Sequence, residues 1–509
     1  MSETEPTGET VEDDVFFPDD DDDVRSPRQP VTFRGVAIVG ARVVTGAIGI
    51  GVAAVTVAAA ALLPLPSVTA VAPSVLVTPV PTAQQLVCSG SVLRLSDESG
   101  QGATEASALG VPRLDVASSS GTVDRSPLER SDADSGGTPA APVIVSTPPN
   151  PADPTERILL SGAQEQEVSS ADFVGLAASA CQAPNAESWL VGGATTVGRT
   201  TLLTLSNPTE VPATVDLELV GESGPIAAPG TRGIIVPPSG QRVLSLAGFA
   251  PEVTSPVVRV TSTGGQVVAE LQQSIVRGLV PGGLDIVGAS VVPGTDVVIP
   301  GLVVSGAADI ETTLGIGPGF EDLQTVLRVY VPGETSADAT IRVIPEDGVG
   351  TGTSFAFTFD AGRVVDVPIP DLADGAYTVR VESDVPLVAA GRVSAAAGEA
   401  TDFAWLASSP VLTEVAPVTV ADGPDPVLHL ANAGDAAVTV VIDGPGTDDL
   451  EVQVEAGAAV SVPVEPGASY VLSGFSRLHA AVSVGADGMT ARYAVAPPGV
   501  GSSPVLVYP

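Results

Sequence analysis

Few side chains in this sequence could carry out acid–base or nucleophilic chemistry, and the pattern around them favours structural roles. The two histidines are His429, in the segment VLHLAN, and His479, in the segment SRLHAAV. Alternation along a strand puts His429 on the face opposite to Leu428 and Leu430, which predicts that it faces water. Neither histidine has a serine or cysteine nearby in the context of an activated nucleophile. We therefore expect surface or edge histidines and no catalytic residues.

Neighbouring carboxylates are the second group that could do chemistry, and they occur at Glu321-Asp322, Glu346-Asp347 and Asp448-Asp449. Glycosidases need two carboxyl groups that face each other across a cleft, one of them with a raised pKa. These pairs stand in Gly-rich segments that are typical of turns beside solvent, where carboxylates stay ionised. A calcium site in these loops stays open, because hard cations bind such oxygens, although no D-x-[DN]-x-[DN]-G pattern occurs. We predict no metal site and no cofactor.

The absence of lysine removes several classes of enzyme from consideration. All 21 basic residues are arginine, so the chain has neither the lysine of a Walker A loop nor the amine of a Schiff-base enzyme. The sequence also has no G-x-S-x-G elbow and no H-E-x-x-H motif. Its formal net charge of −39 repels nucleic acid and anionic lipid head groups, so we expect no nucleic-acid partner.

The uncharged run Val43–Leu63 predicts a single membrane-spanning helix. A helix rises about 1.5 Å per residue, so this run matches the roughly 30 Å hydrocarbon layer of a bilayer. The arginines that precede the run place the N-terminus in the cytoplasm and the bulk of the chain outside: Arg25, Arg28, Arg34 and Arg42. The alternative is a cleaved signal peptide with a site at Ala70–Ala72, but signal peptides have shorter apolar cores. The predicted location is therefore the cell membrane.

Small residues four apart in this run could let two such helices pack closely, at Ala47/Gly51, Gly49/Ala53 and Ala54/Ala58. In a chain rich in Ala and Gly this spacing arises easily by chance. Dimerisation through the membrane helix is therefore an alternative that the sequence leaves open.

Cys88 and Cys181 are the only two cysteines, and both follow the predicted span. In an oxidising compartment, two cysteines without other candidates are expected to pair with each other. Two cysteines alone do not supply the four ligands of a structural zinc site. The sequence therefore predicts one disulfide, Cys88–Cys181.

Composition indicates an all-β exterior. The chain has 55 Gly, 46 Pro and only 4% aromatic residues, and its β-branched segments are punctuated by turn residues. The predicted order begins with an acidic disordered cytoplasmic tail (1–35), the membrane segment (36–63) and a Pro-rich spacer (64–83). A Cys-linked segment follows at 84–187, with a flexible Ser/Gly/Pro loop at about 96–156.

The sequence from 188 onward contains three copies of one pattern. Each copy starts with two alternating strands joined by a polar turn, at 202–219, 326–343 and 427–442. Each continues with a strand–loop–strand–turn–strand pattern, at 236–271, 359–393 and 454–484, with matching glycines at Gly240, Gly362 and Gly457. About a hundred residues with alternating strands is the size of an immunoglobulin-like sandwich.

We therefore predict three tandem immunoglobulin-like β-sandwiches, at 188–290, 291–411 and 412–509, and expect each copy to have its own core. A single β-propeller is the alternative, but it needs shorter and more numerous repeats. Trp189 and Trp405 each lie just before the strands of a repeat, the first and the third, and Tyr377 and Tyr470 occupy corresponding places. Recurrence at matching positions predicts that these rings fill sandwich cores rather than stack on sugars.

The segment SWLVGGATTVGRTTLLTLSNPTEVPATVDLEL (188–219) resembles a family of uncharacterised actinobacterial envelope proteins, known only as a domain of unknown function. Cys181, the turn Leu205–Pro208 and the motif Ile299–Leu302 carry the rest of the resemblance. It implies one N-terminal membrane span and a Val/Ala/Gly-rich exterior, and it supplies no activity or catalytic residues.

Three readings of function remain. The leading hypothesis is a non-enzymatic, membrane-anchored envelope protein that acts as a spacer or scaffold and contacts another envelope protein or the wall. The second is a carbohydrate-binding accessory protein that contacts cell-wall glycan during polysaccharide assembly. The third is a secreted hydrolase whose cleft forms between domains.

Overall fold

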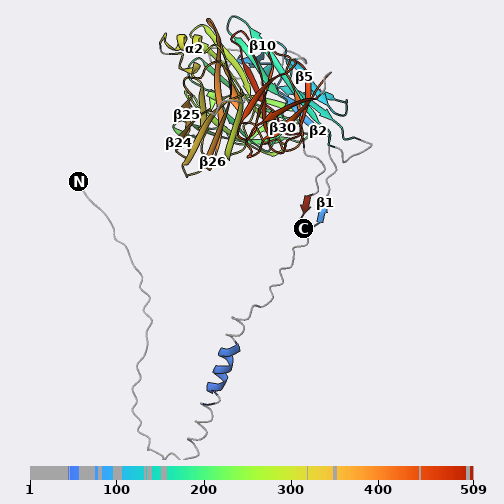
Figure 1. Ribbon diagram of the computed structural model, residues 1–509, viewed down its shortest axis with the longest axis vertical. Coiled ribbons are helices and arrows are strands. Elements are labelled where there is room, and N and C mark those ends of the chain that lie inside the picture. The colour runs from blue at the N-terminus through green and yellow to red at the C-terminus, as the bar shows by residue number, and fades with distance from the viewer. Residues whose placement is uncertain are drawn as a thin grey trace, which may run out of the picture. The chain divides into compact units, whose positions relative to one another are not determined.

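The chain folds almost entirely into β-strands, as its alternating pattern predicts. The computed structural model describes residues 44, 46–56, 75–77, 83–95, 106–130, 133–134, 140–150, 157–317, 319–347, 352–445, 449–499 and 505–507. Besides the helical residues 46–56, the described part of the chain has the short α-helix α2 (Ala307–Leu314) and 3-10 turns at η2 (Leu246–Gly248) and η3 (Glu321–Leu323). Residues Leu76–Leu506 form one compact unit, and Figure 1 shows its strands.

The predicted membrane span is only partly described. Val44 and residues 46–56 are helical, and the rest of Val43–Leu63 lies outside the described residues. Among the helices that the structure describes, none has both the length and the apolar character that a membrane crossing requires. The predicted acidic tail (1–35) and most of the Pro-rich spacer (64–83) also lie outside the described residues.

The first repeat consists of two sheets that share a core. One sheet has the order β12-β18-β14-β15 with β16 beside β14: β12 (Glu187–Val191), β18 (Val257–Gly264), β14 (Ala213–Gly221), β15 (Gly224–Ile226) and β16 (Ile234–Val236). The other has the order β20-β19-β13-β17-β7: β20 (Val280–Val287), β19 (Val268–Arg277), β13 (Arg199–Asn207), β17 (Gly240–Ser245) and β7 (Glu129–Arg130).

The second repeat has the same strand order, except that the long strand β26 runs through both sheets. One part has the order β21-β26-β23-β24: β21 (Gly294–Val304), β26 (Gly375–Ala397), β23 (Ala337–Pro345) and β24 (Thr353–Phe359). The other has the order β27-β26-β22-β25: β27 (Ala400–Ala407), β22 (Val326–Tyr330) and β25 (Val364–Pro368).

The third repeat has two four-stranded sheets. The first has the order β28-β33-β30-β31: β28 (Ala416–Thr419), β33 (Ser469–Ser473), β30 (Val438–Asp443) and β31 (Leu450–Val454). The second has the order β35-β34-β29-β32: β35 (Ala491–Ala494), β34 (His479–Val484), β29 (Val427–Ala431) and β32 (Ala459–Pro463). Three copies of one topology therefore underlie the threefold sequence pattern.

The N-terminal part adds three small sheets. They are β11-β10-β5, β2-β9-β6 and β3-β4-β8: β11 (Val174–Ala180), β10 (Leu160–Ser169), β5 (Arg113–Ser118), β2 (Gln84–Cys88), β9 (Val143–Thr147), β6 (Asp124–Pro127), β3 (Leu93–Leu95), β4 (Ala106–Ala108) and β8 (Ala133–Asp134). Strands β1 (Val75–Val77) and β36 (Val505–Val507) pair with each other. The prediction of a flexible loop over 96–156 is wrong for its described residues, because small and polar residues there still pair as strands.

A buried asparagine recurs at the first turn of two repeats. Asn207 accepts a hydrogen bond from the N–H two residues further on, at 2.9 Å, and donates one to the carbonyl four residues further on, at 2.8 Å. Asn432 makes the same two bonds at the same lengths. Since a buried amide must satisfy its donors and acceptor, both turns keep one conformation.

The matching turn glycines are only partly equivalent. Gly362 and Gly457 have positive φ angles of 73° and 69°. In the first repeat Ser239 has the positive φ, at 49°, and Gly240 begins strand β17 instead.

The repeats do not keep separate cores, contrary to expectation. The core of the first repeat includes Phe403 and Trp405 of β27 together with Val388 of β26. Ala163, Leu176 and Ala178 of the N-terminal part belong to the core of the third repeat. The reason is that four strands meet at a common centre: β11 of the N-terminal part and β20, β27 and β35 of the first, second and third repeats. There, β11 and β27 each contact β20 and β35.

Asp402 of β27 is the polar group at this centre, and its side chain is fully buried. The backbone N–H of Leu176 in β11 donates to its Oδ2 at 2.9 Å, and that of Leu284 in β20 donates to its Oδ1 at 3.1 Å. The N–H of Thr490, next to β35, donates to Oδ2 at 3.2 Å. One carboxyl group therefore joins all four parts of the fold.

The buried carboxyl groups predict that the fold is more stable in mild acid. Burial raises the pKa of Asp402 to about 7, although backbone donors oppose the rise, and burial also raises the pKa of Glu270 to about 7. An unfolded carboxyl group has a pKa near 4, so its stabilising contribution is complete below about pH 4 and is lost as the pH rises to about 7. Burial lowers the pKa of His479, which opposes this trend below about pH 6.5. We expect a higher melting temperature at pH 5 than at pH 8.

The variant Asp402→Asn tests whether Asp402 causes the pH dependence of the melting temperature, because a neutral amide cannot titrate. Its melting temperature, followed by circular dichroism from pH 5 to pH 8, should change less with pH than that of the unmodified chain. Asp172→Asn changes an exposed carboxylate and should keep the full pH dependence. An unchanged pH dependence in Asp402→Asn would contradict this assignment.

Candidate functional site

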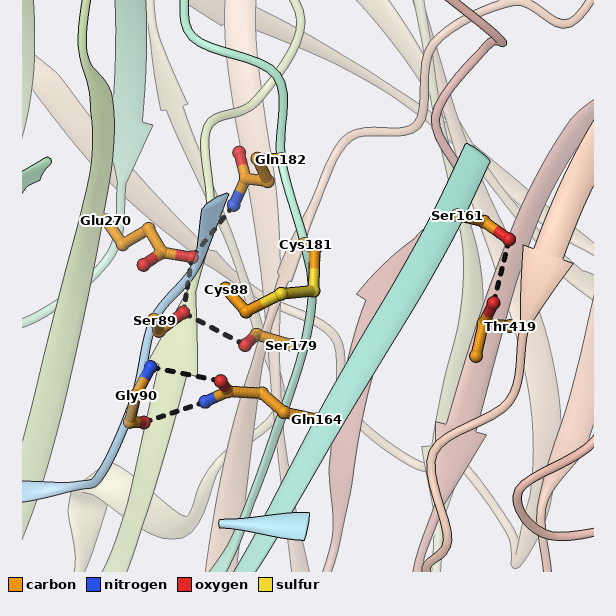
Figure 2. Close-up of a disulfide and its surroundings, with 10 residues drawn as sticks. All are labelled: Cys88, Ser89, Gly90, Ser161, Gln164, Ser179, Cys181, Gln182, Glu270 and Thr419. Atoms are coloured by element: carbon orange, nitrogen blue, oxygen red, sulfur yellow. Dashed lines mark hydrogen bonds between the residues drawn. A yellow bond between two sulfur atoms is a disulfide. The ribbon is translucent and has the colours of Figure 1, made fainter. Parts of the chain in front are cut away.

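The predicted disulfide between Cys88 and Cys181 is present, and it joins β2 to the residue that follows β11 (Figure 2). Both cysteines are buried. Next to the bridge, Ser89 donates a hydrogen bond to Glu270 Oε1 at 2.8 Å, and Gln182 Nε2 donates to the same oxygen at 3.1 Å. Among the described residues, the side chains that contact this buried carboxyl group are neutral donors, which is why burial dominates its pKa.

Glutamine side chains hold the backbone that follows Cys88. Gln164 of β10 accepts from the N–H of Gly90 at 3.0 Å and donates to the carbonyl of Gly90 at 2.8 Å (Figure 2). Gln272 of β19 makes the same pair of bonds to Leu93, at 2.7 and 2.5 Å. Each amide thus satisfies both main-chain hydrogen-bonding groups of one residue.

A pocket of about 330 Å³ opens beside the disulfide, between the N-terminal part and the third repeat. Ser161 of β10 and Thr419 of β28 form a 2.7 Å hydrogen bond across it (Figure 2). The lining is apolar or carries amide and hydroxyl groups, and it includes no charged residue: Ala83, Gln84, Gln85, Leu86, Leu160, Ser161, Gly162, Ala180, Cys181, Ala183, Pro184, Gln266, Pro417, Val418, Thr419, Tyr493, Ala494, Val495, Ala496, Pro497 and Gly499. Such a lining can bind a neutral ligand, and among its described residues the phenol of Tyr493 is the one titratable group.

The prediction that His429 faces water is wrong. Its side chain is fully buried between the second and third repeats, where Nδ1 lies 2.5 Å from Glu346 Oε2 and Nε2 lies 2.7 Å from Ser483 Oγ. Glu346 is also buried, although it was expected beside solvent, and its Oε1 accepts bonds from Gly301 N–H and Thr378 Oγ1. Burial alone would raise the pKa of Glu346, but the imidazole and these hydrogen bonds hold it below its usual value.

Serine, histidine and carboxylate in this order are the parts of a hydrolytic triad. Here the serine has a relative exposure of 6%, the histidine 0% and the glutamate 4%, and none of the three lines the pocket. A substrate carbonyl must approach the serine oxygen closely, and a serine that is 6% exposed leaves little access for one. The arrangement therefore acts as a hydrogen-bonded contact between repeats.

The sequence could not reveal this contact. Glu346 lies in the second repeat and His429 in the third, so only the packing of the two repeats brings them together. Ser483 was detectable in principle, since it lies on β34, the strand next to β29, and pairs there with Val427, two residues before His429. His479 is also buried, contrary to expectation, with Nδ1 2.8 Å from the carbonyl of Ser409.

The remaining carboxylate pairs do not assemble into a site. Asp322 forms ion pairs with Arg277 at 2.8 Å and Arg199 at 3.2 Å; burial alone would raise its pKa, but the arginines lower it. Glu321 is exposed, Asp449 is exposed, and Asp448 lies outside the described residues. In the part of the chain that the structure describes, no three His, Cys, Asp or Glu residues are grouped so that they could hold a metal ion.

The tryptophans fill cores, as predicted. Trp189 and Trp405 are 5% and 2% exposed, and Trp405 Nε1 donates to Gln273 Oε1 at 2.6 Å. Tyr377 and Tyr470 are half-buried and pack against the cores of the second and third repeats. These rings therefore offer no open platform for a sugar.

A family model matches most of this fold. The model of DUF5719, a family of unknown function, matches residues 134–465, which is well over half of the chain. The chain belongs to this family. No curated protein matches it. One solved structure with a reported similarity is a GH78 family rhamnosidase of Bacillus sp. GL1, with 10% identity and a TM-score of 0.11, covering 64% of this chain and 55% of that chain. A TM-score this low supports no conclusion about fold or activity.

The buried triad predicts a structural effect and no catalysis. A fluorophosphonate probe, which labels activated serines, should leave Ser483 unlabelled in the native chain, as judged by mass spectrometry. Ser483→Ala should instead lower the free energy of unfolding by about 1–3 kcal/mol, because the buried imidazole loses a partner. Stoichiometric labelling that Ser483→Ala abolishes would contradict the structural role.

Proposed function

We propose that this protein is a non-enzymatic interaction scaffold of the cell envelope, anchored to the membrane by Val43–Leu63. The observation that carries the proposal is that the catalytically capable side chains and the accessible pocket lie in different places. The groups with catalytic chemistry are buried and hydrogen-bonded between repeats, whereas the accessible pocket has a neutral lining. A neutral pocket with amide and hydroxyl groups binds a ligand without transforming it.

The hydrogen-bonded centre around Asp402 supports the same proposal. The hydrogen bonds of Asp402 join the three repeats and the N-terminal part. The pocket walls come from β2, β10 and β28, which belong to parts that this centre joins. A pre-formed wall reduces the ordering cost of binding, which suits a scaffold that holds a partner.

Location and topology are part of the proposal and rest on the sequence. The arginines before Val43 and their absence just after Leu63 support a cytoplasmic N-terminus. The disulfide supports an oxidising compartment for the folded body. Carbohydrate binding is the alternative function, since amides and hydroxyls also bind sugar hydroxyl groups.

The test is affinity capture of the full-length chain from cross-linked membranes, with a pocket variant and a matched control. Gln266→Arg places a charge on an exposed residue of the pocket wall, and Gln324→Arg makes the same change at an exposed residue outside it. We expect one envelope protein to be recovered with the unmodified chain and with Gln324→Arg, and to be lost with Gln266→Arg. Recovery of no partner, or of wall glycan alone, would overturn the scaffold proposal.

A further inference from the structure

We propose that the pocket beside the disulfide binds an extended, uncharged peptide segment of a partner protein, which adds as a strand to the free edge of β2. This inference rests on the proposed scaffold function and specifies the chemistry of its partner. In strand addition, main-chain hydrogen bonds provide affinity and the surrounding pocket selects side chains.

The free edge follows from the hydrogen bonds of β2. Val87 donates its N–H to the carbonyl of Gln182 at 2.8 Å and accepts the N–H of Gln182 at 2.9 Å, so these groups point away from β9. In an antiparallel strand, residues two apart direct their N–H and C=O to the same edge. The N–H and C=O of Gln85 therefore face this edge too. Gln85 is exposed and lines the pocket, and no described strand pairs with the edge there.

A bound peptide strand would extend the pairing that Gln182 already makes with the edge of β2. Gln182 occupies the edge of β2 beside Val87, and the chain then turns away through Ala183 and Pro184, which line the pocket. The position beside Gln85 comes next along the same edge. A volume of about 330 Å³ lies at the small end of the range for ligand pockets, so it admits a few residues of a peptide.

The lining of the pocket disfavours charged ligands. The chain carries a net charge of −39, yet its pocket is lined only by apolar, amide and hydroxyl groups. Placing a charged side chain there removes its water without supplying a counter-charge, which is costly. Ser161 and Thr419 already bond to each other, which leaves the amides of Gln84, Gln85 and Gln266 as the groups that can meet a polar ligand.

Glutamine side chains of this protein already bind main-chain groups. The amides of Gln164 and Gln272 each bond both to the N–H and to the C=O of a single residue, Gly90 and Leu93 respectively. The pocket glutamines offer the same donor and acceptor pair beside a free strand edge. This chemistry fits a peptide main chain.

The lining fits a peptide better than a sugar. The only aromatic residue in it, Tyr493, is 7% exposed, and its hydroxyl group donates to the carbonyl of Thr419 and accepts the N–H of Ala421. Its ring and hydroxyl group are therefore committed to the fold and give no stacking surface. A neutral glycan is thus an outcome of the test and not the proposed ligand.

The experiment selects ligands from a phage-displayed library of random dodecapeptides on the immobilised full-length chain. We expect enriched peptides to share an uncharged central stretch. The synthetic form of an enriched peptide is then titrated against two variants. Gln85→Pro removes the backbone N–H at the free edge, where proline is tolerated, and should weaken binding at least tenfold. Gln85→Ala keeps that N–H and should change the affinity less than threefold.

A second variant does not disturb the backbone. Gln266→Glu adds a carboxylate to the pocket wall and should also weaken binding of the uncharged peptide, while Gln324→Glu outside the pocket should not. Enrichment of charged peptides, equal binding to Gln85→Pro, or binding of a neutral glycan array in place of peptides would overturn the inference. If membrane capture still depends on the pocket in that case, the scaffold proposal stands and only the peptide assignment fails.

Discussion

The carboxyl group of Asp402 accepts backbone hydrogen bonds from β11, β20 and the residue before β35, and it belongs to β27. The surrounding backbone is adapted to it. A side chain at Gly175 or Gly283 would place its Cβ 2.7 or 2.5 Å from Asp402 Oδ1, so both positions need glycine, and both have positive φ. A buried carboxyl group without these donors would be costly, which makes the close approach of the four strands a condition of the fold.

The two other features of interest depend on this centre. The neutral pocket has walls from the N-terminal part and from the third repeat, so its shape exists only when those parts are held together. The contact between Glu346, His429 and Ser483 similarly needs the second and third repeats in place. Arg492 strengthens the same boundary, since it donates to the carbonyl of Pro300 at 3.0 Å and to Ser409 Oγ at 2.9 Å. Buried polar contacts thus hold neighbouring repeats together.

The sequence was sufficient for the features that are local or repeated. Alternation predicted strands, three copies of a pattern predicted three copies of one topology, and an isolated pair of cysteines predicted the disulfide. Trp189 and Trp405 were predicted as core residues because they recur near repeat starts. The predictions that failed were those that depend on packing between repeats. His429 looked exposed because alternation defines two faces of a strand, and here the second face is covered by Glu346 from another repeat. Strands β5 and β7 were missed because their pairing partners, β10 and β17, lie far away in the sequence.

The central claim is that the repeats form one body around Asp402 rather than three independent sandwiches on a string. Differential scanning calorimetry of the full-length chain tests this claim directly. We predict one transition for the folded body, with a calorimetric enthalpy equal to the van't Hoff enthalpy, because the shared centre makes the parts unfold together. Independent sandwiches would instead give separate transitions, each with an enthalpy of about 70 kcal/mol per hundred residues. Resolved transitions of that size would contradict the account.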